Sequence, residues 1–148
     1  DSSIFSRLEE EITALNENGL EFEIIPGVSS AMAAAAAAKI PLTRRVMSRR
    51  VQFITGHDFN GELPDDLNIA SLIDPNCTTV IFMGKKTFPN LAQILLDNGL
   101  DIKTKVLIAE DISRKEENIK KGTIEEILIY LKDIQSNHPA VIIFGPLL

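Results

Sequence analysis

Residues 21–43 read EFEIIPGVSSAMAAAAAAKIPLT, and the rest of the chain is organised around this stretch. The apolar run at 22–25 predicts a short strand that Pro26 ends, and Gly27 permits a turn that a side chain would hinder. Ser29 or Ser30 can then cap the alanine run as a helix, because a serine hydroxyl accepts from the first free N–H groups. A strand, a tight turn and a helix start often form a binding site. The structural alternative is that the alanines only allow close packing and the serine only caps.

The remaining chain alternates apolar segments with turn residues. Apolar residues at helical spacing predict helices at 67–73, 88–96 and 124–134, the last capped by Thr123. Strands are predicted at 51–55, 78–82, 106–109 and 140–144, with an edge strand or hairpin at 118–121. The β-branched and apolar run at 78–82 is typical of a strand covered on both faces. We therefore expect an α/β domain with a mixed sheet and helices on both faces.

The beginning of the chain predicts a separate helix that ends at Asn18 and Gly19. Its outward face is acidic, and its apolar face consists of Ile4, Phe5, Leu8, Ile12 and Leu15. Asp1 is not an initiator methionine, so we expect the 148 residues to be the trailing part of a longer protein. A trimmed terminus is the alternative.

Composition narrows the class of protein. A chain of 148 residues with 45% hydrophobic content can bury one core, and no apolar run approaches the roughly 20 residues that span a bilayer. With no secretory leader visible, we expect no membrane association and a cytoplasmic location. The net charge of -6 and the 5% aromatic content oppose nucleic-acid binding. One cysteine, Cys77, and two histidines, His57 and His138, lack the spacing of zinc ligands, so no metal is expected.

Six short motifs follow one another along the chain: DSSIFSR at 1–7, IPGVSS at 25–30, IPLTRR at 40–45, FITGH at 53–57, FMG at 82–84 and PAVIIFG at 139–145. In their order and spacing they resemble the second half of proteins of the tetrapyrrole methylase family. The resemblance implies a two-domain α/β fold with S-adenosylmethionine between the domains, and a homodimer. Residues 1–20 would then be a helix joining an N-terminal domain, and residues 21–148 the C-terminal α/β domain.

The resemblance implies one activity above others, the C-methylation of uroporphyrinogen III to precorrin-2 in siroheme and cobalamin biosynthesis. A later precorrin or cobalt-precorrin methyltransferase is an alternative, because the Asp-Ser-Ser opening is less standard for the family than Asp-Pro. A second alternative, of another class, is a non-catalytic module that dimerises and binds a nucleotide-like ligand.

Matching the motifs residue by residue implies a set of cofactor contacts. A carboxylate offsets the sulfonium charge, helix-start N–H groups can hold the cofactor carboxylate, and a backbone turn can hydrogen-bond adenine. The implied contacts are Asp1, Ile4, Ser29, Ser30, Met83 and Gly84. The chain departs from the family pattern at Ser2, Ser6, Arg44 and Ile112. The family's glycine-rich loop and its catalytic groups belong to the N-terminal domain, so we assign no catalytic residue.

Two arginine doublets stand out in an acidic chain, at 44–45 and 49–50. Arginine binds carboxylates bidentately, so Arg44 and Arg45 are candidates for docking the carboxylate rim of the substrate. A solvated charge run is the alternative. His57 is a further candidate for a substrate carboxylate, or else a residue that stabilises its own loop.

Overall fold

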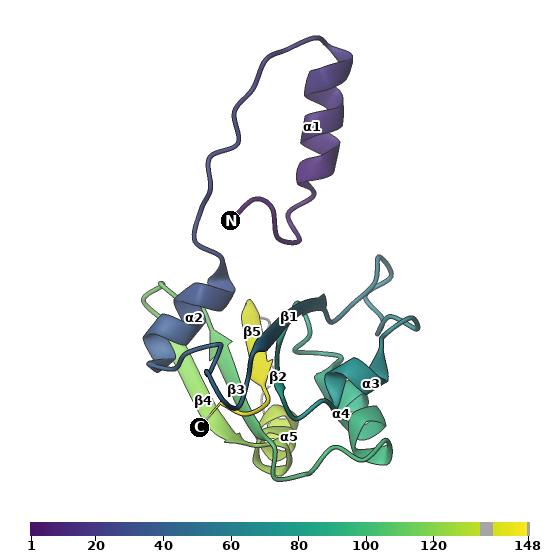
Figure 1. Ribbon diagram of the computed structural model, residues 1–148, viewed down its shortest axis with the longest axis vertical. Helices are drawn as coiled ribbons and strands as arrows, with labels where there is room; N and C mark the ends of the chain where they lie inside the picture. The colour runs from purple at the N-terminus through teal and green to yellow at the C-terminus, as the bar shows by residue number, and fades with distance from the viewer. Residues whose placement is uncertain (134–137, 148) are drawn as a thin grey trace.

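The computed structural model describes residues 1–133 and 138–147. These residues form a five-stranded sheet in the order β1-β2-β5-β3-β4 (Figure 1). The strands are β1 (Arg50–Thr55), β2 (Cys77–Phe82), β3 (Lys105–Glu110), β4 (Asn118–Thr123) and β5 (Ala140–Phe144). β1 and β2 are parallel, whereas β5 is antiparallel to β2 and β3, and β4 is antiparallel to β3. The predicted mixed sheet, including the edge strand near residue 118, is confirmed.

Helices cover both faces of the sheet, as the sequence predicted. One face carries α2 (Ser30–Ala38), and the other carries α3 (Ile69–Leu72), α4 (Phe88–Asp97) and α5 (Ile124–Asp133) (Figure 1). Successive strand residues alternate between the two cores. In β5, Ile143 packs on the α2 side and Ile142 on the side of α4 and α5, and both are fully buried. Residue 134, the predicted end of the last helix, lies outside the described residues.

The alanine helix α2 packs on its face of the sheet through single methyl groups. Ala31, Ala34, Ala35 and Ala38 are buried at helical spacing. Ser29 caps this helix, since its Oγ accepts from the N–H of Ala31 at 3.3 Å. Extra methylenes on this side would overpack the core, typically at a cost of about 1–3 kcal/mol each.

The last helix begins with a reciprocal pair of hydrogen bonds. Thr123 Oγ1 accepts from the N–H of Glu126 at 3.3 Å, and Glu126 Oε2 accepts from the N–H of Thr123 at 2.8 Å. The predicted cap at Thr123 is therefore confirmed, in the form of a capping box.

The N-terminal arm, residues 1–28, corrects two predictions. Helix α1 (Leu8–Glu17) begins later than predicted, because Phe5 and Arg7 adopt left-handed φ angles of 52° and 63° that a helix cannot contain. The predicted strand at 22–25 is extended coil. A strand needs a hydrogen-bonding neighbour, and this segment runs away from the sheet toward α1 (Figure 1).

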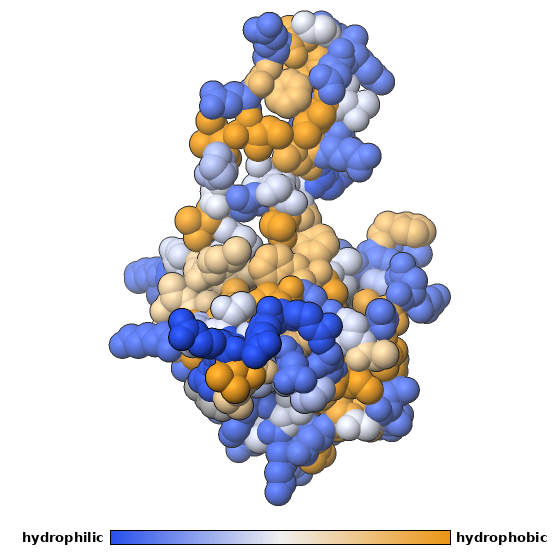
Figure 2. Space-filling view, in the orientation of Figure 1, coloured by the Kyte–Doolittle hydropathy of each residue, from blue (hydrophilic) through white to orange (hydrophobic). Residues whose placement is uncertain are grey.

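The arm exposes apolar surface that the sheet domain does not cover. No residue of α1 is buried, and Ile25 on the connector is 69% exposed. Figure 2 shows hydrophobic residues along the side of the arm where α1 and the connector face each other. Across the described residues, no helix combines the length and apolar character needed to cross a membrane.

Candidate functional site

A pocket opens where β2 and β3 end and β5 begins. The residues directly after the two strands, Met83 and Asp111, both take left-handed backbone angles, with φ of 54° and 47°. The pocket between them has a volume of about 320 Å³ and reaches the first residue of α2. It is lined by Ser30, Phe82, Met83, Ala109, Asp111, Ile112, Arg114, Pro139, Ala140 and Val141.

The two left-handed residues mark this pocket as a functional candidate. A residue with a Cβ in this conformation costs roughly 1–2 kcal/mol, so surrounding contacts must hold it there. Such residues cluster at ligand sites, where the chain must turn sharply to present backbone groups. Met83 and Asp111 turn in this way at the ends of β2 and β3, and the pocket lies between them.

Two glycines from separate motifs touch behind Met83. A Cβ on Gly56 would lie 2.2 Å from the Cα of Gly84, so neither position has room for a side chain. Thr87 binds both turns, donating its hydroxyl to the carbonyl oxygen of Gly56 and, at 3.3 Å, to that of Gly84. The motifs at 53–57 and 82–84 therefore form one packed unit, which places Met83 at the pocket.

The first residues of the arm reach the same end of the sheet. Asp1 Oδ2 accepts from the N–H of Gly27 at 3.0 Å, which ties the opening motif to the turn before α2. The rings of Phe5 and Phe82 are 5.2 Å apart, and Ile4 packs against the core beneath α2. Three motifs that are far apart in sequence thus meet beside the pocket.

Ser29 and Ser30 have different positions and roles. Ser29 is buried and its hydroxyl caps α2, so it builds the turn. Ser30 is exposed and lines the pocket, so it is the serine that a ligand can touch. Gly84 is buried behind the pocket wall and acts through its backbone.

His57 lies at the same end of the sheet as Met83, because Thr55 pairs with Phe82 in the parallel register. It is half-buried, and its Nδ1 donates to the carbonyl oxygen of Asp58 at 2.9 Å. This bond places the proton of a neutral ring on Nδ1. Donation from Nε2 to a carboxylate would therefore require the protonated imidazolium.

The pocket wall contains a buried carboxylate that the motif comparison missed. Asp111 is 5% exposed, and its Oδ2 lies 2.5 Å from His138 Nδ1 while its Oδ1 lies 3.6 Å from Arg114 Nη1. The available sequence signal was a pair of acidic residues, Glu110 and Asp111, directly after the apolar run at 106–109. His138, which the motifs left without a role, is 53% exposed and borders this wall.

A second buried carboxylate lies behind the pocket. Glu110 forms an ion pair with Lys85 and accepts from Asn118 Nδ2 at 3.0 Å and from the Tyr130 hydroxyl at 3.1 Å. Burial by itself raises the pKa of Glu110, but the hydrogen bonds of Lys85, Asn118 and Tyr130 outweigh it and hold the pKa below the ordinary value. Burial is also the main cause of the raised pKa of Tyr130.

The arginines lie at the other end of the sheet. Arg50 pairs with Cys77, the first residue of β2, and six residues at about 3.3 Å each put the two ends of β2 about 17 Å apart. Arg44 Nη2 donates to the carbonyl oxygen of Leu147 at 2.9 Å, and Arg45 is exposed. Figure 2 shows a strongly hydrophilic band over the loop that joins α2 to β1. The structure does not bring Arg44 and Arg45 to the pocket, and their substrate role stays a prediction.

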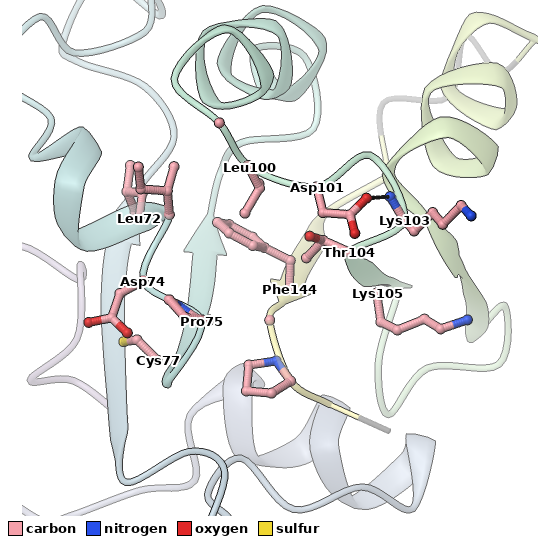
Figure 3. A pocket seen from close by; sticks show the side chains of 14 residues that line it. Leu72, Asp74, Pro75, Cys77, Leu100, Asp101, Lys103, Thr104, Lys105 and Phe144 are labelled. Atoms are coloured by element: carbon pink, nitrogen blue, oxygen red, sulfur yellow. Dashed lines mark hydrogen bonds between the residues drawn. The ribbon is translucent and has the colours of Figure 1, made fainter.

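A larger pocket, of about 490 Å³, lies at the arginine end between β2, β3 and β5 (Figure 3). Leu72, Leu100 and Phe144 approach one another along one side of it, and Lys103 and Lys105 extend away. Burial raises the pKa of the Cys77 thiol at its rim. The described residues around this pocket include none of the predicted cofactor contacts, so we take the smaller pocket as the candidate site.

Comparison with known proteins agrees with these motifs. The sequence profile of the Tetrapyrrole (Corrin/Porphyrin) Methylases matches residues 1–128. A siroheme synthase of Chromobacterium violaceum is 38% identical over 149 residues, which cover 98% of this chain and 30% of that protein. The chloroplastic S-adenosyl-L-methionine-dependent uroporphyrinogen III methyltransferase of Arabidopsis thaliana is 36% identical over 149 residues, covering 98% of this chain and 39% of that protein.

A solved structure supports the same relationship. Uroporphyrin-III C-methyl transferase from Thermus thermophilus, complexed with S-adenyl homocysteine, superposes with a TM-score of 0.79 at 28% identity. The alignment covers 99% of this chain and 62% of that one. The chain spans about a third of the length of the curated relatives it matches. By its motifs, its fold and these matches, the chain belongs to the tetrapyrrole (corrin/porphyrin) methylase family.

Proposed function

We propose that this chain is the second domain of an S-adenosylmethionine-dependent enzyme that C-methylates uroporphyrinogen III to precorrin-2. The relatives support this choice, since one is described as a uroporphyrinogen III methyltransferase and another as a siroheme synthase. The observation that carries the proposal is that Asp1, Ser30 and Met83, all predicted cofactor contacts, lie at one end of the sheet.

The residues at the pocket fit one part of such a cofactor. Its volume of about 320 Å³ is at the lower end of the range of about 300–1,000 Å³ that holds small ligands. Seven of its ten lining residues are apolar, which suits a flat aromatic ring, and Ser30 lines it from the start of α2. The left-handed turn at Met83 gives this wall a sharply bent backbone.

When bound, S-adenosylmethionine supplies a methyl group activated by the positive charge on sulfur. The task of this domain is then to hold one side of the cofactor, to exclude water and to align the methyl with the ring carbon. Asp1 contributes a carboxylate close to the turn before α2, where it offsets a nearby positive charge. We assign none of the described residues to proton transfer.

The predicted substrate contacts lie at opposite ends of the sheet, His57 at one end and Arg44 and Arg45 at the other. His57 lies at the same end of the sheet as Met83, where it could contact a macrocycle held beside the cofactor. It would donate a hydrogen bond to a substrate carboxylate as the imidazolium. Arg44 and Arg45 would contact only a substrate that extends along the face toward the opposite end of the sheet. Docking by the arginines is therefore the more demanding part of the proposal.

The arm supports the assignment of residues 1–20 as a helix that joins another domain. Leu8, Ile12 and Leu15 of α1 are only partly buried, and Phe22 and Ile24 on the connector are 41% and 44% exposed. We propose that a preceding domain packs on α1 and pairs with the extended segment at 22–25, which would then become the predicted strand. A cytoplasmic homodimer remains our expectation for the whole protein.

Calorimetry with S-adenosylhomocysteine tests the proposal. This chain holds only one wall of the cofactor site, so we expect weak or no binding to it and clear binding once the preceding domain is restored. Tight binding to the 148-residue chain alone would contradict a site divided between two domains.

Turnover separates the proposal from its alternatives. The restored protein should methylate uroporphyrinogen III. Turnover only with a later precorrin or a cobalt-precorrin would favour the other family members. Cofactor binding without turnover of any tetrapyrrole would favour a non-catalytic ligand-binding module.

A further inference from the structure

Four polar side chains from four different elements meet behind the candidate pocket. Lys85 precedes α4, Glu110 ends β3, Asn118 begins β4 and Tyr130 lies on α5. The ion pair between Lys85 and Glu110 is largely removed from water, with side chains 14% and 6% exposed. Asn118 Nδ2 also lies 2.9 Å from the Tyr130 hydroxyl, and both donate to the same oxygen of Glu110.

This cluster is connected to both walls of the pocket. Lys85 is two residues after Met83, in the turn that leaves β2. Glu110 lies between Ala109 and Asp111, which both line the pocket. Because strand side chains alternate, Ala109 faces the α2 side while Glu110 points to the side of α5. The ion pair thus joins the Met83 wall to the Asp111 wall from the back of the sheet.

The strength of this connection follows from its surroundings. Removing a single partner from a buried ion pair is strongly destabilising, typically by about 3–5 kcal/mol, because the other charge loses its compensation. Glu110 keeps its charge here because Lys85, Asn118 and Tyr130 all donate to it. Exposed pairs elsewhere on the chain, such as Arg7 with Glu10, carry no such constraint.

We propose that Lys85 and Glu110 are positioning residues of the cofactor pocket, whose ion pair sets the spacing between the Met83 turn and the Asp111 turn. This inference rests on the proposed function, because it assigns the cofactor to that pocket. Neither residue need touch the cofactor. Both act through the two left-handed residues that they hold in place.

The test compares Lys85→Met, Glu110→Gln and the double variant in the complete protein, with the preceding domain present. Each single change should weaken S-adenosylhomocysteine binding about tenfold, within the range by which residues that do not touch the ligand alter its affinity. The Michaelis constant for the tetrapyrrole should stay within about twofold of wild type, because the candidate substrate contacts His57, Arg44 and Arg45 do not line this pocket.

The double variant distinguishes positioning from stability. It carries neither charge of the pair, so its melting temperature should recover toward wild type while its cofactor affinity stays low. Recovery of affinity together with stability would overturn the proposal, as would single variants that bind like wild type. Asp74→Asn is the matched control, since it breaks the ion pair with Arg50 at the other end of the sheet and should leave cofactor affinity unchanged.

A Glu110→Asp variant and the wild-type complete protein complete the experiment. If the neutral variants fail to fold, Glu110→Asp keeps the charge but shortens its reach, and it should still weaken cofactor binding. Wild-type affinity in a folded Glu110→Asp variant would then overturn the proposal. Failure of the wild-type complete protein to bind S-adenosylhomocysteine would instead overturn the proposed function, and this inference with it.

Discussion

A glycine follows each of β1 and β2 within two residues, and Met83 between β2 and its glycine has a left-handed φ, whereas at the amino ends of the two strands four of the seven residues 44–50 are arginines. The first end is tightly constrained, with two glycines in backbone contact and an ion pair buried behind them. At the second end, Arg45 and Arg49 are exposed and point to solvent-accessible surface.

The difference follows from what each end can bind. Backbone groups and close packing can shape a site for a flat, neutral ring, but only within a rigid frame. Exposed arginines attract anions over a longer range and need little rigidity. Our proposal accordingly assigns the cofactor to the first end and the carboxylates of the substrate to the second.

The largest expected effect is on methyltransferase activity, because the pocket at the carboxyl ends of β1 and β2 forms only part of the proposed cofactor site. Methyl transfer needs donor sulfur, methyl carbon and ring carbon nearly in line, and a misplacement of about 1 Å can cost about a hundredfold in rate. The 148-residue chain alone should therefore show no methyltransferase activity. Incubation with radiolabelled cofactor and freshly reduced uroporphyrinogen III checks this, with the restored protein as the positive control. Label found in the tetrapyrrole with this chain alone would contradict the prediction, because it would show that this chain carries the methyl-transfer chemistry without the preceding domain.

The glycine contact gives the next effect. Gly56→Ala should lower the free energy of unfolding by about 3 kcal/mol, because its Cβ would lie 2.2 Å from the backbone of Gly84. Urea denaturation measures this. Gly61→Ala is the control, since that position has open space and only a left-handed φ of 81°, and it should cost about 1 kcal/mol. Equal losses in the two variants would show that the close approach is not what limits this end of the sheet.

The arginine end is tested by Arg45→Ala in the complete protein. If Arg45 docks substrate carboxylates, the Michaelis constant for the tetrapyrrole should rise about tenfold, as expected for loss of a charged hydrogen bond of about 1.5 kcal/mol. The constant for the cofactor should not change. Arg44→Ala should add a loss of stability, because its guanidinium also binds the carbonyl of Leu147. Equal effects of Arg45→Ala on both constants would indicate structural damage.

The smallest expected effect is a loss of folding stability in acid that depends on Glu110. The pKa of Glu110 is lowered in the folded chain, with hydrogen bonds from Lys85, Asn118 and Tyr130 outweighing burial. Its contribution to stability is therefore present above the unfolded pKa and lost as the pH falls through the lower, folded pKa. Unfolding measured from pH 7 downward should show a steeper acid loss for wild type than for Glu110→Gln. Parallel curves would show that this carboxylate does not carry the acid sensitivity.

The secondary structure of the sheet domain could be predicted because its signals are local. The run at 78–82 is buried on both faces, and the apolar residues of α4 recur at helical spacing, so each segment specifies its own conformation. The cap at Thr123 needs a partner only three residues away. The prediction of a strand at 22–25 was wrong because a strand depends on a hydrogen-bonding neighbour and not on local signals alone. The described residues supply no such neighbour.

The candidate site was predictable only in part. Motif order placed Asp1, Ser30 and Met83 in one site, and the structure brings them to the same end of the sheet. It could not place Arg44 and Arg45, because their distance from Met83 depends on the direction of α2 and β1. Asp111 and His138 were missed as a pair because a strand and a helix, β4 and α5, separate them in the sequence.

By itself, the sequence determined the strands and helices of the sheet domain, the cap at Thr123, and a cap of α2 by one of the two serines 29 and 30, since all of these follow from local backbone preferences. Only the tertiary structure decided that Gly56 touches Gly84, that Lys85 pairs with Glu110 25 positions away, and that the arginines lie at the end opposite the pocket. The reason is that sheet order and strand direction set which remote residues meet, and neither is encoded in any single segment.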